Sequence, residues 1–166
     1  MMVLLDTIET AFLVAFRDQD LFFGLGEGLT SWDIDGLPDP GVDLFELEAP
    51  LAYKRIRDKR FVVADAGGAI IVKDALDVDH TFTISEIPTG KLYLAVLFDN
   101  AELPTATFRE RSIVSGLVLP AEAAPGQDFF LAAEVSGGTT LAYETHAPIV
   151  RHILIQEKFT EVIEFT

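Results

Sequence analysis

The feature that most constrains the fold of this chain is a series of short, strand-like segments that begins after Pro50. Runs rich in Val, Ile, Phe and Thr recur at intervals of roughly ten residues, and Gly or Pro separates them without an intervening helical pattern. This spacing is typical of antiparallel sandwiches and barrels. We therefore expect a mainly β protein, an antiparallel β-sandwich or barrel. The expected strands lie at 80–87, 91–99, 108–119, 129–136, 141–150 and 152–165.

Two parts of this region predict more than a strand. Residues 59–74 contain two β-branched runs on either side of Asp65-Ala66-Gly67-Gly68, which predicts a β-hairpin. Residues 91–99 are apolar at both alternating sets of positions, which predicts a central strand that is covered on both faces. The β domain is thus expected to span 51–166, with 118–166 as a candidate for a separate C-terminal β extension.

The N-terminal residues predict an amphipathic helix. Leu5, Ile8, Phe12 and Phe16 follow one another at intervals of three or four residues, with polar residues between them. This pattern indicates a helix from about residue 4 to residue 19. We expect residues 1–20 to form this helix, which packs on the sheet of its own chain or on a neighbouring subunit.

The next segment, 21–50, lacks a regular period and is rich in glycine, proline and acidic residues. An irregular segment of this length is uncommon in a compact domain unless it has a function. Single apolar residues such as Trp32 and Leu37 are spread along it and could be buried. We therefore expect an extended, ordered arm that lies over a surface.

The alternate glycines Gly24, Gly26 and Gly28 raise the question of a phosphate-binding loop. Such a loop follows a strand and is completed by a lysine, whereas this one follows the predicted helix and carries Glu27 instead. Nucleotide binding is therefore not expected. The glycines are interpreted as a chain reversal at the helix end, where glycine adopts positive φ at low cost.

Charge and composition exclude several classes of function. The formal charge of −15 argues against nucleic-acid binding, which needs a basic surface. The chain has no cysteine, so disulfides and thiolate metal sites are absent. It has no apolar run of the length of about 20 residues that crosses a bilayer, and no basic start typical of a signal peptide. We therefore expect that the protein is made in the cytoplasm and does not associate with a membrane.

The basic residues are concentrated in one segment, YKRIRDKR at 53–60. It holds five of the 12 basic residues and one acid, a charge of +4 within a chain of −15, so the remainder carries −19. We expect Arg55, Arg57 and Lys59 to alternate on one strand face and to meet carboxylates of a neighbouring subunit, including another copy of this chain. The alternative is a solvated strand with extended basic side chains.

Patterns for catalysis or metal binding are incomplete. Asp33 and Asp35 begin a calcium-loop pattern, but Leu37, Pro38 and Leu44 occupy later positions that need ligands or a glycine. The three histidines lack the spacing of a zinc site, and no serine lies in a nucleophile motif. We therefore expect no enzymatic activity, no catalytic residue, no metal, no cofactor and no small-molecule substrate.

Aromatic residues and prolines make the arm a candidate protein interface. Phe22, Phe23, Trp32, Pro38 and Pro40 offer large, stiff contact surfaces, which protein interfaces favour. The alternative is that Trp32 closes the core of its own chain, and one residue can serve both roles in an assembling protein.

Two other functions remain open at this stage. A carbohydrate-binding β-sandwich would use Trp32, Tyr53, Tyr93 or Tyr143 as a stacking platform, provided that several of these converge on one exposed face. An enzyme of unrecognised type would need an acid pair or histidine cluster in a deep pocket.

The order of motifs from about residue 20 to residue 117 resembles that of small baseplate or distal-tail proteins of tailed bacteriophages. In that family a GxGxxxxW phrase leads into a basic strand, a VVxDxGGxI hairpin, an LYL strand and an arginine-glutamate strand. Ala64 departs from the proline that often precedes the hairpin aspartate, and residues from Leu119 onward match nothing in the family. The matching residues are Gly24, Gly26, Trp32, Asp39, Pro40, Lys54, Arg55, Val62, Val63, Asp65, Gly67, Gly68, Ile70, Leu92, Tyr93, Leu94, Arg109 and Glu110.

This resemblance implies a non-enzymatic virion structural protein of the phage tail or baseplate. Such a protein is present in several copies, is assembled in the host cytoplasm and joins neighbouring tail, baseplate or fibre subunits. Its expected partners are other virion proteins and further copies of itself. The mean hydropathy of +0.32 fits this interpretation, because subunits of obligate assemblies complete their burial against one another.

Overall fold

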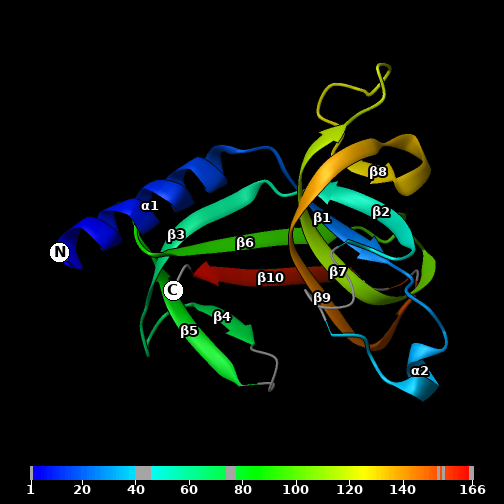
Figure 1. The fold of residues 1–166 in the computed structure, drawn as a ribbon, viewed down its shortest axis with the longest axis horizontal. Coiled ribbons are helices and arrows are strands. Elements are labelled where there is room, and N and C mark those ends of the chain that lie inside the picture. Colours follow the sequence, from blue (N-terminus) through cyan, green and yellow to red (C-terminus); the bar gives the residue numbers. More distant parts are fainter. Residues whose placement is uncertain (1, 40–45, 74–77, 153, 155, 165–166) are drawn as a thin grey trace. The chain divides into compact units, whose positions relative to one another are not determined.

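The computed structural model of the chain describes residues 2–39, 46–73, 78–152, 154 and 156–164 (Figure 1). The fold is mainly β, and its strands form two five-stranded antiparallel sheets after an N-terminal helix, as expected. The elements are α1 (Met2–Asp18), β1 (Leu21–Gly26), α2 (Trp32–Asp35), β2 (Pro50–Arg55), β3 (Asp58–Ala64), β4 (Ile70–Lys73), β5 (Asp79–Ile84), β6 (Lys91–Phe98), β7 (Thr105–Val118), β8 (Phe129–Leu131), η1 (Ala132–Glu134), β9 (Ser136–His152) and β10 (Glu157–Glu164).

The chain divides into two compact units that interleave along the sequence. Unit 1 comprises Met1–Gln19, Arg57–Val96 and Lys158–Thr166, and unit 2 comprises Asp20–Ile56 and Leu97–Glu157. The sheet of unit 1 has the strand order β10-β6-β3-β5-β4, and that of unit 2 has the order β8-β2-β1-β7-β9. The expected boundaries at residues 20, 50 and 118 stay predictions about independently folding parts.

In unit 1, α1 confirms the helix that the sequence predicted. Leu13 is fully buried, whereas the neighbouring Phe12 remains largely exposed. The Arg17 guanidinium lies 4.9 Å from the ring centroid of Phe61, and the Lys59 amino group donates to the Gln19 carbonyl at 2.5 Å. These contacts join the end of the helix to strand β3.

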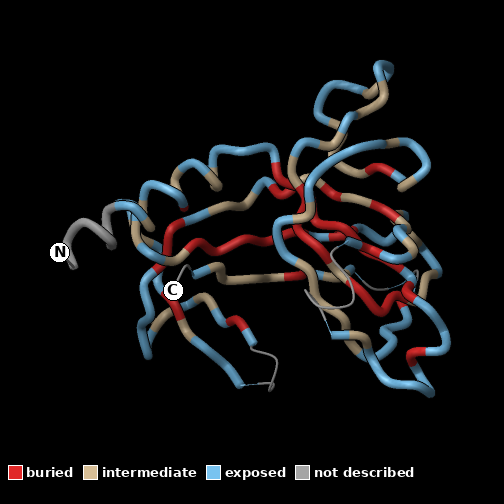
Figure 2. The backbone as a smooth tube through the Cα atoms, in the orientation of Figure 1, coloured by how far each residue is buried: buried red, intermediate tan, exposed pale blue. Residues whose placement is uncertain are grey.

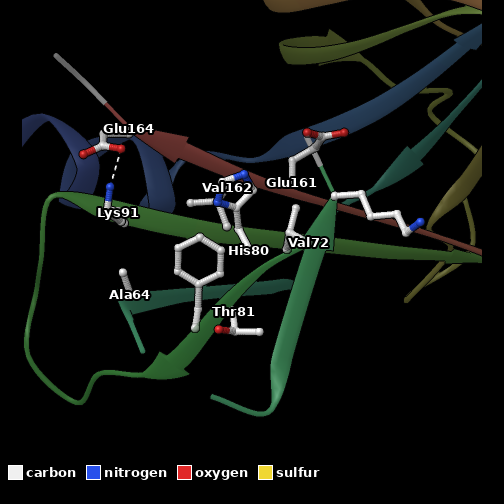
Figure 3. A pocket seen from close by; sticks show the side chains of 10 residues that line it. Ala64, Val72, His80, Thr81, Lys91, Glu161, Val162 and Glu164 are labelled. Carbon is white, nitrogen blue, oxygen red and sulfur yellow. Dashed lines mark ion pairs between the residues drawn. The ribbon is translucent and has the colours of Figure 1, made fainter. Parts of the chain in front are cut away.

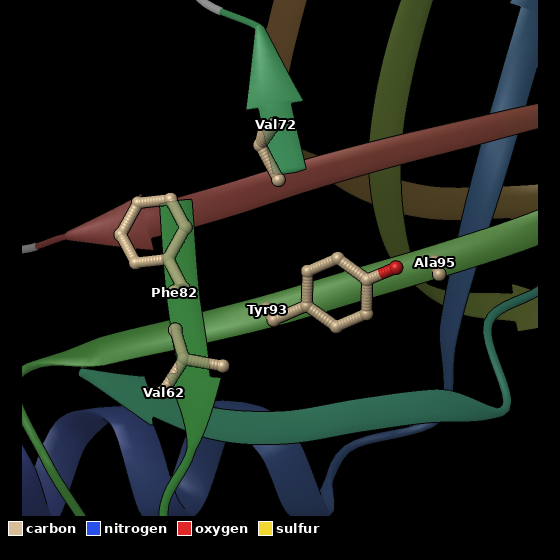
Figure 4. Close-up of a cluster of buried hydrophobic side chains, with 5 residues drawn as sticks. All are labelled: Val62, Val72, Phe82, Tyr93 and Ala95. Atoms are coloured by element: carbon tan, nitrogen blue, oxygen red, sulfur yellow. The ribbon is translucent and has the colours of Figure 1, made fainter. Parts of the chain in front are cut away.

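The core of unit 1 is a cluster of side chains from four strands (Figure 4). β6 lies between β10 and β3 and is buried from Leu92 to Val96, which confirms the predicted central strand at 91–99. The cluster consists of Val62, Val72, Phe82, Tyr93 and Ala95, with Ile70 and Val162 packed against it.

The predicted hairpin at 59–74 is wrong in its pairing. β3 and β4 do form from the two β-branched runs, but β3 pairs with β5 and β6, while β4 pairs with the other edge of β5. The chain between them passes so close to β5 that a Cβ on Gly68 would overlap the Phe82 backbone. Asp65 supports this crossing, because it accepts hydrogen bonds from Gly67 N at 2.9 Å and Thr83 Oγ1 at 2.7 Å.

In unit 2, residues 21–26 form the central strand β1 rather than part of an irregular arm. All six residues are buried, and β1 pairs antiparallel with β2 on one side and β7 on the other (Figure 2). A chain reversal at Gly24 and Gly26 is therefore also wrong, since both lie in this strand. A strand hydrogen-bonded along both edges is favoured here because it buries Phe22 and Phe23. Burial of each side chain stabilises the fold by about 1.5–3 kcal/mol relative to leaving it exposed.

The basic segment 53–60 does not form one strand. Arg55 ends β2 in unit 2, and the buried Ile56 donates its N–H to the Leu21 carbonyl at 2.8 Å. Arg57 follows in the connection, and Lys59 belongs to β3 in unit 1. The three residues do not belong to one strand, so the expected alternation of Arg55, Arg57 and Lys59 on one strand face is wrong.

The remaining strands follow the predicted positions with changed lengths. The expected strand at 129–136 shrinks to β8 and is followed by the short helix η1, and the expected strand at 152–165 begins only at residue 157. β7 and β9 form a long antiparallel pair along one side of the unit 2 sheet. No helix in the described ranges is long and apolar enough to cross a membrane.

The Gly68 crossing generates a test of the unit 1 topology. Gly68→Ala should lower the free energy of unfolding by about 1–3 kcal/mol, because the new methyl group overlaps the backbone of β5. Urea denaturation followed by circular dichroism measures this change. Gly90→Ala is the matched control, since a Cβ at that glycine has open space around it. Equal stability of the two variants would contradict the close crossing.

Candidate functional site

The most distinctive feature of unit 2 is the connection between β1 and β2, residues 27–49, which we call the acidic loop. It contains seven acidic residues and no Lys, Arg or His. It carries the one-turn helix α2, and its two ends meet where Glu27 N donates to the Ala49 carbonyl at 2.8 Å (Figure 1). Residues 40–45 within it lie outside the described part of the chain.

A single carboxylate, that of Glu110 on β7, holds both ends of the acidic loop. Glu110 is fully buried and accepts hydrogen bonds from the N–H groups of Gly28 (3.2 Å), Glu48 (2.9 Å) and Ala49 (2.9 Å). The Tyr143 hydroxyl donates a fourth bond at 2.7 Å. Burying a carboxylate is costly unless donors surround it, so these four bonds make the position of the loop ends depend on Glu110.

The glycines that resembled a phosphate loop make room for this arrangement. Gly26 lies opposite Glu110 in the β1–β7 register, and a Cβ at Gly26 would overlap the carboxylate. A Cβ at Gly24 would lie 2.6 Å from Ser112 Oγ. Gly28 adopts φ +63, and a Cβ there would lie 2.5 Å from the Trp32 ring. Gly26 and Gly28 are therefore glycines because a side chain there would overlap the carboxylate of Glu110 and the indole of Trp32.

Arg109, the neighbour of Glu110, holds the middle of the loop. Its Nε and Nη2 donate to the two carboxylate oxygens of Asp33 at 2.8 and 2.7 Å, and its Nη1 donates to the Glu27 carbonyl at 3.2 Å. Such a two-bond pairing is geometrically specific. The hydrogen bonds from Arg109 lower the pKa of Asp33 below its ordinary value. Together, Arg109 and Glu110 attach the described part of the loop to β7 at its start, middle and end.

Tyr143 reaches the same carboxylate from β9. Its pKa is raised above its ordinary value, first by burial and then by its hydrogen bond to Glu110. The phenol therefore remains protonated and continues to donate to the carboxylate at physiological pH. β1, β7 and β9 thus contribute the glycine gap, the carboxylate and the hydroxyl of one connected network.

The aromatic residues proposed as an interface lie inside unit 2. Phe22 and Phe23 are 1% and 3% exposed and make edge-to-face contacts with Phe130 and Phe98. Trp32 is 9% exposed and packs next to Gly28. The structure thus places all three side chains in the fold of their own chain, which corresponds to the alternative stated for Trp32.

The other sequence-predicted interface residues are dispersed. Pro38 is half-buried, and its carbonyl accepts a bond from Thr145 Oγ1 at 3.2 Å. Arg55 pairs with Asp20 and lies over the Phe22 ring. Pro40 lies outside the described residues, Arg57 is exposed in unit 1, and Lys59 is bonded to the C-terminal side of α1. A role for these residues in binding a partner stays a prediction.

The aromatic platform of the carbohydrate-binding alternative does not assemble on an exposed face. Trp32 is buried and Tyr53 and Tyr143 are half-buried, and all three belong to unit 2. Tyr93 is 4% exposed and belongs to the core of unit 1. In the described part of the chain, no three His, Asp or Glu side chains gather in a way that could hold a metal ion.

In the described part of the acidic loop, three large apolar side chains are exposed, which we call the loop tip: Leu29, Ile34 and Leu37. Ile34 is 89% exposed, Leu29 is 44% and Leu37 is 45% exposed. The sequence contains a signal for this arrangement, because residues two apart in a helical turn point to opposite sides. Burying Trp32 in α2 therefore exposes Ile34.

The role of Glu110 in holding the ends of the acidic loop can be tested by removing its charge. In Glu110→Gln, the amide nitrogen faces N–H donors and leaves them unpaired, so the free energy of unfolding should fall by about 2–4 kcal/mol. Hydrogen exchange should accelerate most at residues 28, 48 and 49. The exposed Glu122→Gln serves as control. Unchanged exchange at the loop ends would show that Glu110 does not hold them.

The Asp33–Arg109 pair predicts a dependence on acid. Because the pKa of Asp33 is below its ordinary value of 3.8 in the folded state, its contribution is fully present above pH 3.8. That contribution is lost as the pH falls through the lowered pKa. Fluorescence of Trp32, the only tryptophan of the chain, should report this step. Asp33→Asn should abolish the step, and its persistence in that variant would assign it to another group.

A family model identifies the class of proteins to which this chain belongs. No protein among the curated ones matches the chain. A family model described as "Baseplate wedge 3 tail fiber network component" matches residues 3–165, which is nearly the whole sequence and includes the part after Leu119 that the phage-tail resemblance left unmatched. This match confirms the expected phage baseplate class and implies a location in the virion tail. The chain belongs to the family of baseplate wedge 3 tail fiber network components, a family of phage baseplate structural proteins.

Proposed function

We propose that this protein joins neighbouring subunits of the baseplate, without enzymatic activity, and that the loop tip is one of its contact surfaces. The observation that carries the proposal is the 89% exposure of Ile34 on a loop that Glu110 and Arg109 hold in place. When a partner covers a large apolar side chain, the removal of that surface from water lowers the free energy and favours binding.

The attachment of the loop supports this role. Binding by a flexible loop costs entropy when the loop becomes ordered, and a loop that is already fixed avoids most of this cost. The bonds that Glu110 accepts from Gly28, Glu48 and Ala49 lie before and after the loop tip along the chain, and the Arg109–Asp33 pair lies within it. The tip is therefore presented in one conformation, as expected for an interface that must form reproducibly in every particle.

The charge of the loop indicates the kind of surface that it meets. The sequence of the acidic loop holds seven acidic residues, and this charge favours a partner with basic groups around an apolar depression. The same charge keeps the loops of different copies from associating directly through like surfaces. The family description names a tail fibre network, which supports neighbours among the wedge and fibre subunits.

Further contact residues are proposed alongside the loop tip. Pro38, Pro40, Arg55, Arg57 and Lys59 are candidate contact residues, because a virion subunit presents more than one surface to its neighbours. Several copies in each particle and assembly in the host cytoplasm are likewise proposed. Partners are proteins, with no nucleic acid, membrane or small-molecule substrate.

The proposal predicts a defect in assembly without a defect in folding. Ile34→Asp should leave the thermal unfolding of the purified protein unchanged, because the side chain contacts little of its own chain. When the variant is supplied to a phage whose own copy of the gene is disabled, the yield of infectious particles should be at least about tenfold lower than with the wild-type protein. Electron microscopy should show tails with incomplete baseplates.

Ile87→Asp is the matched control, because Ile87 is also isoleucine and is 71% exposed. It should restore particles to the wild-type level. If Ile34→Asp complements as well as Ile87→Asp, the loop tip is not a contact surface.

A further inference from the structure

Strand β9 contains a β-bulge where it passes the residues that hold the acidic loop. Three consecutive residues of β9, 146–148, lie opposite the single residue Arg109, because the β7–β9 register shifts between Phe108 and Glu110. Such bulges are typical of edge strands, and β9 is the last strand in the order of the unit 2 sheet (Figure 1). The bulge therefore lies beside the two β7 residues, Arg109 and Glu110, that attach the loop.

The first residue of the bulge is His146, and its ring packs against the core of unit 2. The ring meets that of Phe108 edge-to-face, with centroids 5.4 Å apart, and Phe108 is fully buried. His146 Nδ1 lies 2.8 Å from the carbonyl oxygen of Ala147. Because a carbonyl oxygen only accepts hydrogen bonds, Nδ1 carries a proton and donates it. In the neutral ring, Nε2 therefore carries none.

The second ring nitrogen makes this position sensitive to acid. Within the described part of the chain, His146 Nε2 is buried and has no hydrogen-bond partner. Protonation of the ring places an N–H group and a positive charge at this atom, where no acceptor is within reach. Burying a charged donor without an acceptor is costly, whereas burying a neutral ring nitrogen costs much less. The closed bulge therefore accommodates the neutral ring better than the protonated one.

The charged groups that face the ring do not reverse this preference. Arg111 on β7 disfavours a second positive charge, whereas Glu110 on β7 and Glu144 on β9 favour it. Both carboxylates are already engaged, Glu144 with Arg111 at 2.7 Å and Glu110 with Tyr143 and the loop N–H groups. Burial has the largest influence, and it lowers the pKa of His146 below its ordinary value of 6.5.

The residue before the bulge connects β9 to the acidic loop. Thr145 Oγ1 donates to the Pro38 carbonyl at 3.2 Å, and Pro38 directly follows Leu37 of the loop tip. Thr145 is also the partner of Glu110 in the β7–β9 register. If the bulge is displaced, the Thr145 hydroxyl moves away from this side of the tip. The attachments through Glu110 and Arg109 remain, because they start from β7.

We propose that His146 is a pH-sensitive latch for the acidic loop: its neutral ring keeps the bulge closed and Thr145 on Pro38, and its protonated ring leaves the buried position and releases this contact. The proposal concerns how the loop is attached and does not depend on what the loop tip binds. A histidine is suited to such a switch because it takes up its proton in weak acid. Release is reversible when the pH returns.

The direction of the pH dependence follows from the burial of the ring. Because the pKa of His146 in the folded chain is below 6.5, the contribution of the neutral ring to stability is fully present above pH 6.5. That contribution is lost as the pH falls through the lowered pKa. The step precedes that of Asp33, whose pKa lies below 3.8, so the two are separable in one acid titration.

The mobility of a spin label beside Pro38 measures the release. The chain has no cysteine, so Leu37→Cys supplies one attachment site in the loop, and Ile87→Cys supplies a matched control site in unit 1. As the pH falls from about 8 to about 5, the rotational correlation time of the label at residue 37 should shorten at least about threefold. The label at residue 87 should keep its correlation time.

Nuclear magnetic resonance of the same protein follows the histidine rings over the same pH range. The gain in mobility at residue 37 should have the same midpoint as the titration of the His146 signal. The two other histidines serve as internal references, since His80 lines a pocket of unit 1 (Figure 3) and His152 is exposed at the end of β9.

The variant His146→Phe keeps an aromatic ring beside Phe108 and cannot be protonated. In this variant the label at residue 37 should not gain mobility, whereas the control His152→Phe should behave as the wild type. The proposal is overturned if the label stays unchanged while His146 takes up its proton, or if the gain in mobility persists in folded His146→Phe. If His146→Phe does not fold, the agreement or disagreement of the two midpoints in the unsubstituted His146 protein decides.

Discussion

The buried carboxylate of Glu110 is the interaction on which the arrangement of unit 2 depends. It accepts bonds from both ends of the acidic loop and from Tyr143 on β9, so it connects the loop to two strands of the sheet. A carboxylate at this depth is tolerated because donors surround it and because Gly26 has no side chain in its way. Substitution of any one of these residues therefore disturbs the hydrogen bonds of the others, because they share a single site.

The same network determines what the molecule presents to its surroundings. Arg109 fixes α2 through Asp33, and α2 turns Trp32 inward against Gly28. Opposite faces of one helical turn cannot both be covered by the same sheet, so Ile34 is left in water. The exposed loop tip is thus a direct consequence of the internal ion pair and the buried indole, and a structural protein of the baseplate can use such a fixed apolar projection in contacts with its neighbours.

Several elements could be predicted because local patterns are sufficient for them. The spacing of Ile8, Phe12 and Phe16 predicted α1, and the apolar run at 91–99 predicted the central strand β6. The strands from residue 105 onward also lie near their predicted positions. The pairing of β3 with β5 could not be predicted, because a β-branched run is equally compatible with any partner strand.

The site was less predictable than the fold. The motif from Gly24 to Gly28 was visible as an anomaly, but its cause, Glu110, lies more than 80 residues away in the sequence and becomes its neighbour only through the β1–β7 register. Likewise, the aromatic residues Phe22 and Phe23 were noticed for their chemistry, and their burial follows from the central place of β1.

The sequence by itself determined that this protein is mainly β with an N-terminal helix, that it has no cysteine and a net charge of −15, and that its order of motifs resembles that of phage tail proteins. These properties depend on composition and on short-range periodicity. Only the tertiary structure decided which strands pair, where the acidic loop is fixed, and that Ile34 rather than Trp32 faces solvent. The physical reason is that registers and buried hydrogen bonds join residues that are distant in sequence, and no local pattern records which of them meet.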